Sequence, residues 1–215
     1  MTHSLNEIEA LCKKAARGAG LSWGMAEEAG RAARWLASMG LAGPDLLAGL
    51  LTQNDPVDHA ATAPAELGAH WQAAGGRLCP LAAGAALNDC GARIAAGAGV
   101  TLAQVSHPLL LAPFAAWVAL FEKVQITLSW AAVTLTTDGA GLWVNGPDAA
   151  ATAPVTLRAQ ITTQPPRGTP FQPSLRGRLS RETESTLGKF AHRTYAPATE
   201  ASRLLGAGAG VSDND

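Results

Sequence analysis

The sequence predicts an α+β fold: an N-terminal three-helix piece plus an antiparallel β meander packed by helices. Three observations predict it. Apolar residues recur at helical spacing over the first fifty positions, and between residues 124 and 163 they alternate with polar residues as in strands. Asp138-Gly139 then marks a tight turn between two strands. The chain of 215 residues is long enough to bury a core without disulfides or metal ions.

The predicted N-terminal piece has a recognisable beginning. Ser4 and Glu7 have the spacing of a capping box, and the helix that they start ends at Gly18. A second helix is expected over Met25–Met39, with Glu27 and Arg31 placed to pair one turn apart. Pro44 begins a third helix that ends at Leu51.

These elements suggest a division of the chain into three parts. Residues 1–52 would form the helical subdomain, and residues 53–70, rich in Asn, Asp and Pro, a linker or a long surface loop. Residues 71–215 would form the α+β body with its C-terminal helices. The first elements expected in the body are a strand, a helix, a second strand and a second helix: Arg77–Pro80, Leu81–Ala98, Val100–Val105 and Pro108–Lys123.

The clearest strand pattern begins at Val124. Apolar residues alternate through Trp130, and a change of register suggests a bulge near Ala131–Ala132. A return strand follows the Asp138-Gly139 turn, and Pro154–Thr163 adds another. Beyond these strands we expect a loop over 164–178 and two helices, Ser180–His192 and one that starts at Pro197 and ends near Leu205.

Composition argues against several classes of function. A formal net charge of −1 leaves no basic excess for phosphate, so nucleic-acid binding is not expected. No apolar run is long enough to cross a membrane, and no signal peptide is apparent, so we expect a cytoplasmic protein. Charged residues make up only 15%, which favours burial in a homo-oligomer or against a partner protein.

The metal-binding and cofactor motifs that we sought are absent from the sequence. The three cysteines are widely spaced, and the five histidines show no HxxxH or HExxH spacing, so no metal site is expected. The glycine run from Gly206 to Gly210 lacks the Lys-Ser/Thr of a phosphate-binding loop. No motif names a cofactor, which therefore stays unknown.

The segments SLNEIEALCKKAARGAG, WGMAEEAGRAARWL, CPLAAGAALNDC and TYAPATEASRLLGAGAGVSDND carry a resemblance. Together they resemble an uncharacterised bacterial family, a domain of unknown function, over nearly the whole chain. This likeness implies no established activity. Ser4–Gly43 is also weakly similar to the N-terminal helices of the malate/lactate dehydrogenase type without a Rossmann fold. The chain is too short for that enzyme and does not match its nicotinamide-binding part, so no cofactor is carried over.

Polar residues gather near the C-terminus, where we place the candidate site. A guanidinium matches the two oxygens of a carboxylate, so Arg203 is the predicted anchor of an anionic substrate, assisted by Thr194 and Ser202. Tyr195 and Glu200 are the candidate catalytic acid and base. The structural alternative is that Glu200 and Arg203 complement a helix dipole.

Two further groups have a functional and a structural interpretation. Glu27, Glu28, Arg31 and Arg34 flank Trp23 and Trp35 and could line a pocket with aromatic walls, or form a solvated helix face with tryptophans at an interface. Cys90 could be a nucleophile, but the neighbouring Asp89 would disfavour its thiolate. His107 is the kind of histidine that packs structurally or serves as a base.

The sequence thus leaves two functions open. The leading hypothesis is an enzyme or binding protein for a small carboxylate or other anionic metabolite, with the reaction unknown. The alternative is a non-catalytic partner subunit or an oligomeric interaction protein.

Overall fold

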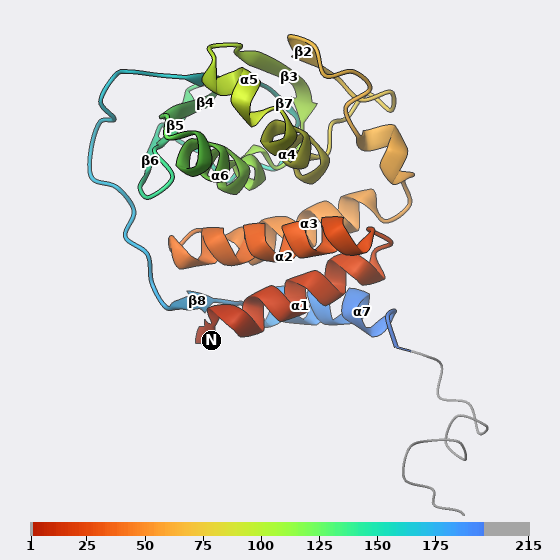
Figure 1. Ribbon diagram of the computed structural model, residues 1–215. Helices are drawn as coiled ribbons and strands as arrows, with labels where there is room; N and C mark the ends of the chain where they lie inside the picture. Colours follow the sequence, from red (N-terminus) through yellow and green to blue (C-terminus); the bar gives the residue numbers. More distant parts are fainter. Residues whose placement is uncertain (1, 196–215) are drawn as a thin grey trace, which may run out of the picture.

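A computed structural model describes residues 2–195 of the chain (Figure 1). Its α+β architecture confirms the predicted fold class. A helical layer lies on one side of the molecule, and an α+β body with a six-stranded sheet lies on the other. The helical layer contains α1 (Leu5–Gly18), α2 (Trp23–Ser38), α3 (Gly43–Asn54) and α7 (Arg181–His192).

The start of α1 is fixed by the predicted capping box. The Ser4 hydroxyl accepts a hydrogen bond from the Glu7 amide at 3.2 Å, and the Glu7 carboxylate accepts one from the Ser4 amide at 2.7 Å. Buried residues on one face of α1, among them Ile8 and Cys12, pack against α2. The first helix therefore begins after Ser4 and ends at Gly18, as predicted.

Helix α2 begins two residues earlier than predicted, with Ser22 as its N-cap. The expected pair between Glu27 and Arg31 was wrong. Arg31 instead pairs with Glu28, three residues away, and Glu27 reaches across to Lys13 of α1. On a helix, side chains three or four positions apart are both close enough to pair. Because Glu27 pairs with Lys13 of α1, Arg31 pairs with Glu28 instead.

The predicted linker contributes structure of its own. After α3 the chain forms a short 3-10 helix, η1 (His59–Thr62), and then the edge strand β2 (His70–Trp71). The expected strand over Arg77–Pro80 reduces to a single bridge between Leu78 and Val105. Pro80 instead occupies the first turn of the next helix, a position where its missing N–H costs nothing.

The predicted helix over Leu81–Ala98 is divided in two. Helix α4 (Pro80–Asp89) ends at Cys90, and the short helix α5 (Gly91–Ala95) follows at once. The next predicted helix is likewise divided, into the 3-10 helix η2 (Pro108–Leu111) and α6 (Ala112–Glu122), which starts just before Pro113. Proline fits the first turn of a helix better than its interior.

The sheet has the order β2-β3-β7-β4-β5-β6, and every neighbouring pair is antiparallel except β2 with β3. Its remaining strands are β3 (Val100–Val105), β4 (Ile126–Trp130), β5 (Val133–Thr137), β6 (Leu142–Asn145) and β7 (Val155–Ile161). The bulge expected near Ala131–Ala132 is a hairpin turn instead, because β4 and β5 pair with each other and Ala131 has φ 45°.

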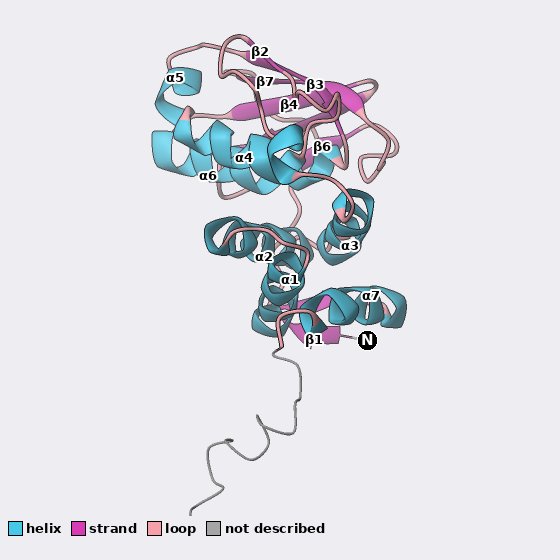
Figure 2. Ribbon diagram, turned by 90° about the vertical axis from the view of Figure 1, so that its right-hand side faces the viewer, coloured by secondary structure: helices cyan, strands magenta, loops and turns pink. Residues whose placement is uncertain are grey.

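One face of the sheet is buried against helices of the body. Ile126, Leu128 and Trp130 of β4 point to this face, as their alternation predicted. Helices α4 and α6 lie between the sheet and the helical layer (Figure 2). The body therefore presents helices, and not its sheet, to the N-terminal helices.

The C-terminal part of the described chain returns to the helical layer. A long segment leaves β7 and leads to β8 (Arg176–Arg178), which pairs antiparallel with β1 (Thr2–Ser4). Helix α7 then packs against α1, with Leu187 and Phe190 buried as predicted. The division of the chain at residues 52 and 70 stays a prediction.

Candidate functional site

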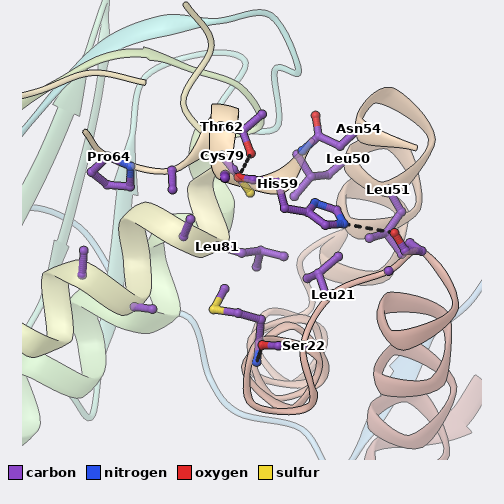
Figure 3. A pocket seen from close by; sticks show the side chains of 18 of the residues that line it. Leu21, Ser22, Leu50, Leu51, Asn54, His59, Thr62, Pro64, Cys79 and Leu81 are labelled. Atoms are coloured by element: carbon purple, nitrogen blue, oxygen red, sulfur yellow. Dashed lines mark hydrogen bonds between the residues drawn. The ribbon is translucent and has the colours of Figure 1, made fainter. Parts of the chain in front are cut away.

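A cavity of about 470 Å³ lies between the helical layer and the body. We call it the interlayer cavity. Four segments form its wall: the connection from α1 to α2, the end of α3, the η1 segment and α4. Figure 3 shows that these segments direct side chains toward a common space. The site is therefore built from parts of the chain that are distant in sequence.

The lining of the interlayer cavity is mainly aliphatic. Leu21, Leu50, Leu51 and Leu81 surround the space in Figure 3, and alanines of α4 complete the wall on the body side. Leu50, Leu51 and Leu81 are almost completely buried, so the wall that they form offers a ligand an apolar surface.

His59 is a polar group on this wall, and its ring orientation is determined by a hydrogen bond. Its Nε2 atom lies 3.1 Å from the carbonyl oxygen of Ala19, at the end of α1. A carbonyl oxygen only accepts, so Nε2 is the donor and carries the proton. In the neutral ring Nδ1 is then an acceptor, and it could accept a hydrogen bond from a hydroxyl or protonated carboxyl group of a ligand.

The other polar side chains of the wall are largely used within the protein. The Thr62 hydroxyl donates to the carbonyl oxygen of His59 at 3.0 Å, and the Ser22 hydroxyl accepts from the Met25 amide at 3.3 Å. Asn54 accepts from Arg77 at 3.2 Å. These contacts already occupy the two hydroxyls and the Asn54 side-chain oxygen, whereas Asp89, an exposed residue of α4, adds a carboxylate to the lining. Most of the wall is aliphatic, so the cavity discriminates mainly by shape and apolar contact.

Cys79 also lines the cavity, but its environment does not favour a nucleophile. Burial raises the pKa of its thiol, although the amides of Ala82 and Leu81 oppose this effect. The thiol thus stays protonated near neutral pH, whereas the thiolate is the reactive form. This arrangement suits binding better than covalent catalysis at Cys79.

The residues predicted near the C-terminus lie away from this cavity where they can be located. Thr194 donates its hydroxyl proton to the carbonyl oxygen of Ala191, and Tyr195 is exposed, with its ring edge-on to His192. Neither residue lines the interlayer cavity. Glu200, Ser202 and Arg203 are outside the described residues, so their predicted roles stay predictions.

Sequence reasoning did not identify the interlayer cavity. Its wall combines leucines and alanines that look like ordinary core residues, and His59 lies in a segment expected to be a linker or a loop. The only local signal was that this segment is long, since long loops in compact domains often have a function.

Metal ligands do not gather within residues 2–195: no group of three or more His, Cys, Asp or Glu side chains there could hold a metal ion. Over the same residues, no helix is both long enough and apolar enough to cross a membrane.

Comparison with known proteins gives a family match over the first part of the chain. Residues 3–79 match the model of a family described as Protein of unknown function (DUF3726). The match spans the helices α1–α3 and the η1 segment, and so most of the cavity wall except α4. No curated protein matches the chain, and nothing supports the predicted likeness to a malate/lactate dehydrogenase.

Proposed function

We propose that this protein binds a small molecule with an apolar body and one polar end in the interlayer cavity. The cavity itself is the observation that carries the proposal. Its volume of about 470 Å³ falls in the range of small-molecule sites, roughly 300–1,000 Å³. Its aliphatic wall with few polar groups is the usual composition of such sites.

The proposal favours binding over catalysis. In the described part of the chain, His59 and Cys79 both line the cavity, but no hydrogen bond joins the imidazole and the thiol. A cysteine nucleophile needs a base within hydrogen-bond reach. The sequence predicted a carboxylate ligand, with Arg203 as its anchor. We therefore compare ligands with two different polar ends, a carboxylate and a hydroxyl.

Isothermal titration with octanoate and 1-octanol tests this function, because the two probes share an apolar chain and differ at the polar end. We expect saturable binding of at least one probe. Ala85 lines the cavity from α4, and an Ala85→Trp variant should fill the space and weaken binding at least about tenfold, or about 1.4 kcal/mol.

Ala92 offers a matched control, because it is exposed on α5 and does not line the cavity. An Ala92→Trp variant should bind both probes like the natural protein. Equal affinity in the Ala85→Trp variant and the natural protein would contradict the proposal. Failure of both probes to bind would contradict it as well.

A second candidate function is that of an interaction protein, and one surface favours it. Leu120 and Phe121 are neighbours at the end of α6, with 61% and 84% of their surfaces exposed. Contiguous exposed apolar side chains often mark an interface. Light scattering after size exclusion should then show a dimer that a Phe121→Ser variant reduces to a monomer. A natural protein that is monomeric at every concentration measured would contradict the proposed dimer.

We also propose a cytoplasmic location. Cys12, Cys79 and Cys90 are all free thiols, as is usual where the environment is reducing. Cell fractionation should recover the protein with cytoplasmic markers. Recovery with periplasmic or membrane markers would show this location to be wrong.

A further inference from the structure

A second hollow, of about 320 Å³, lies where α2 meets α6. Its wall consists of Leu5, Arg31, Arg34, Trp35, Ser38 and Trp117. We call it the arginine–tryptophan hollow. It shares no lining residue with the interlayer cavity, so the two sites can be tested separately.

The polar chemistry of the arginine–tryptophan hollow is one-sided. Arg31 and Arg34 each contribute a guanidinium, and the wall contains no carboxylate. The Ser38 hydroxyl already donates to the carbonyl oxygen of Trp35 at 2.7 Å. Two guanidiniums on one wall suit an anion, provided that the carboxylates paired with them leave donors open.

Both guanidiniums have carboxylate neighbours that leave part of their donor capacity open. Arg31 contacts Glu28 through Nη1 at 3.1 Å, and Arg34 contacts Glu9 through Nη1 at 3.2 Å. A guanidinium carries five N–H donors. Each contact engages one nitrogen, so the remaining donors can bind a ligand without either ion pair being broken.

Aromatic packing holds one side of the hollow in place. The Trp117 ring meets Phe114 edge-on, with centroids 4.9 Å apart, and the guanidinium of Arg31 lies 4.9 Å from the centroid of the Trp117 ring. Cation–π contact restrains the Arg31 side chain before a ligand arrives. A donor that is already ordered loses less entropy on binding.

We propose that the arginine–tryptophan hollow binds a small aromatic or similarly flat organic acid. Its carboxylate would contact Arg31 and Arg34, and its apolar body would pack against the indole of Trp35. Two arginines supply the positive charge. Two tryptophans supply the apolar surface, which would make the hollow bind such an acid more tightly than an inorganic anion. This site is independent of the function proposed for the interlayer cavity.

Titration with benzoate, benzamide and acetate tests the site. Benzamide keeps the flat ring and removes the charge, whereas acetate keeps the charge and removes the ring. Each of the six tryptophans contributes one indole N–H group that a ¹H–¹⁵N spectrum of the full-length protein can follow. We expect benzoate to shift the signals of Trp35 and Trp117 saturably, and to leave that of the buried Trp71 unchanged.

Arginine variants then test whether Arg31 and Arg34 bind the carboxylate of benzoate. Loss of one charge-assisted contact should weaken benzoate about tenfold, so Arg34→Gln and Arg31→Gln should each show this change. Arg93 is exposed on α5 and outside the hollow, so Arg93→Gln is the matched control and should bind benzoate normally. Circular dichroism confirms that the variants are folded.

Three outcomes would overturn the proposal. Benzamide binding as tightly as benzoate would remove the role of the charge. Acetate binding as tightly as benzoate would remove the role of the aromatic wall. Absence of saturable shifts at Trp35 and Trp117 with benzoate would remove the site, whatever octanoate does at the interlayer cavity.

Discussion

His59 and Ala19 meet at the interlayer cavity although 40 positions separate them in the chain. The imidazole of His59 donates to the Ala19 carbonyl oxygen at the end of α1, and its ring packs beside Gly20, which has φ +95°. A left-handed backbone is accessible to glycine at little cost. The contact joins the segment after α3 to the helical layer, and so fixes one wall of the cavity.

Removing the hydrogen-bonding capacity of His59 should destabilise the fold modestly. In a His59→Phe variant the ring is kept, but the Ala19 carbonyl loses its side-chain donor. We expect a loss of about 1 kcal/mol in the free energy of unfolding, measured with urea. His70 is exposed, and a His70→Phe control should change this free energy by less than about 0.5 kcal/mol. Equal effects of the two variants would contradict the role of the contact.

His107 should make the protein less stable as the pH falls below neutral. Burial lowers the pKa of His107 to about 4, and the nearby Arg77 contributes to the shift. The unfolded chain binds a proton near pH 6.5, whereas the folded protein does so only near pH 4. The stabilising contribution is therefore present above pH 6.5 and is lost as the pH falls to about 4.

The loss over this interval should amount to about 2–3 kcal/mol in the free energy of unfolding. A His107→Asn variant removes the titrating group, and Asn tolerates the left-handed backbone at this position, where φ is 48°. Its unfolding free energy should fall less steeply with pH than that of the natural protein. Parallel pH profiles for the two proteins would refute this prediction.

Gly84 permits the close approach of α4 to α6. A Cβ atom at this position would overlap the ring of Phe114, which is completely buried. A Gly84→Ala variant should therefore lose about 1–3 kcal/mol of stability through overpacking.

Gly188, on α7, has nothing within 4 Å of such a Cβ atom, and provides the matched control. A Gly188→Ala variant should gain about 0.5–1 kcal/mol, because alanine favours a helix over glycine. The two variants thus have opposite predicted signs in thermal or urea unfolding. A shared sign would show that the packing between α4 and α6 is looser than described.

Asp55 and Arg193 form an exposed pair between the ends of α3 and α7. The two guanidinium contacts measure 2.5 and 3.0 Å, and this hydrogen bonding lowers the pKa of Asp55. The stabilising contribution is present above the pKa of the unfolded chain, and is lost as the pH falls through the lowered folded value. An Asp55→Asn variant should be slightly less stable at pH 7 and indistinguishable at pH 2.

A double-mutant cycle with Arg193→Gln isolates this pair. The coupling free energy should be positive at pH 7, shrink in high salt because the pair is exposed, and vanish at pH 2. A coupling that is unchanged at pH 2 would mean that the charge of Asp55 has no part in it.

Local signals in the sequence predicted much of the fold. The capping box of Ser4 and Glu7 and the turn at Asp138-Gly139 depend on neighbours within a few residues, and both were predicted. The hairpin turn at Ala131–Ala132 was predicted as a bulge, because alanine carries no turn signal. Its identity follows only from the pairing of β4 with β5.

Long-range contacts were beyond these signals. Asp55 and Arg193 are 138 positions apart, and no spacing rule connects them. The interlayer cavity likewise joins Leu50, His59 and Leu81 from three elements. The predicted pocket with aromatic walls has a partial counterpart in the arginine–tryptophan hollow, which contains Arg31, Arg34 and Trp35. Its second tryptophan was predicted wrongly, because Trp117 of α6 lines the hollow and Trp23 instead lies against Arg17.

The position of a ligand within the protein tests the central proposal most directly. Methyl groups of Met25, Leu50, Leu51 and Leu81 line the interlayer cavity, whereas those of Leu120 are exposed on α6. In a ¹H–¹³C methyl spectrum, titration with octanoate or 1-octanol should shift the first four saturably and leave Leu120 unchanged. Shifts confined to Leu120 and other surface methyl groups, or no saturable shift with either probe, would contradict the proposal that this cavity is a ligand-binding site.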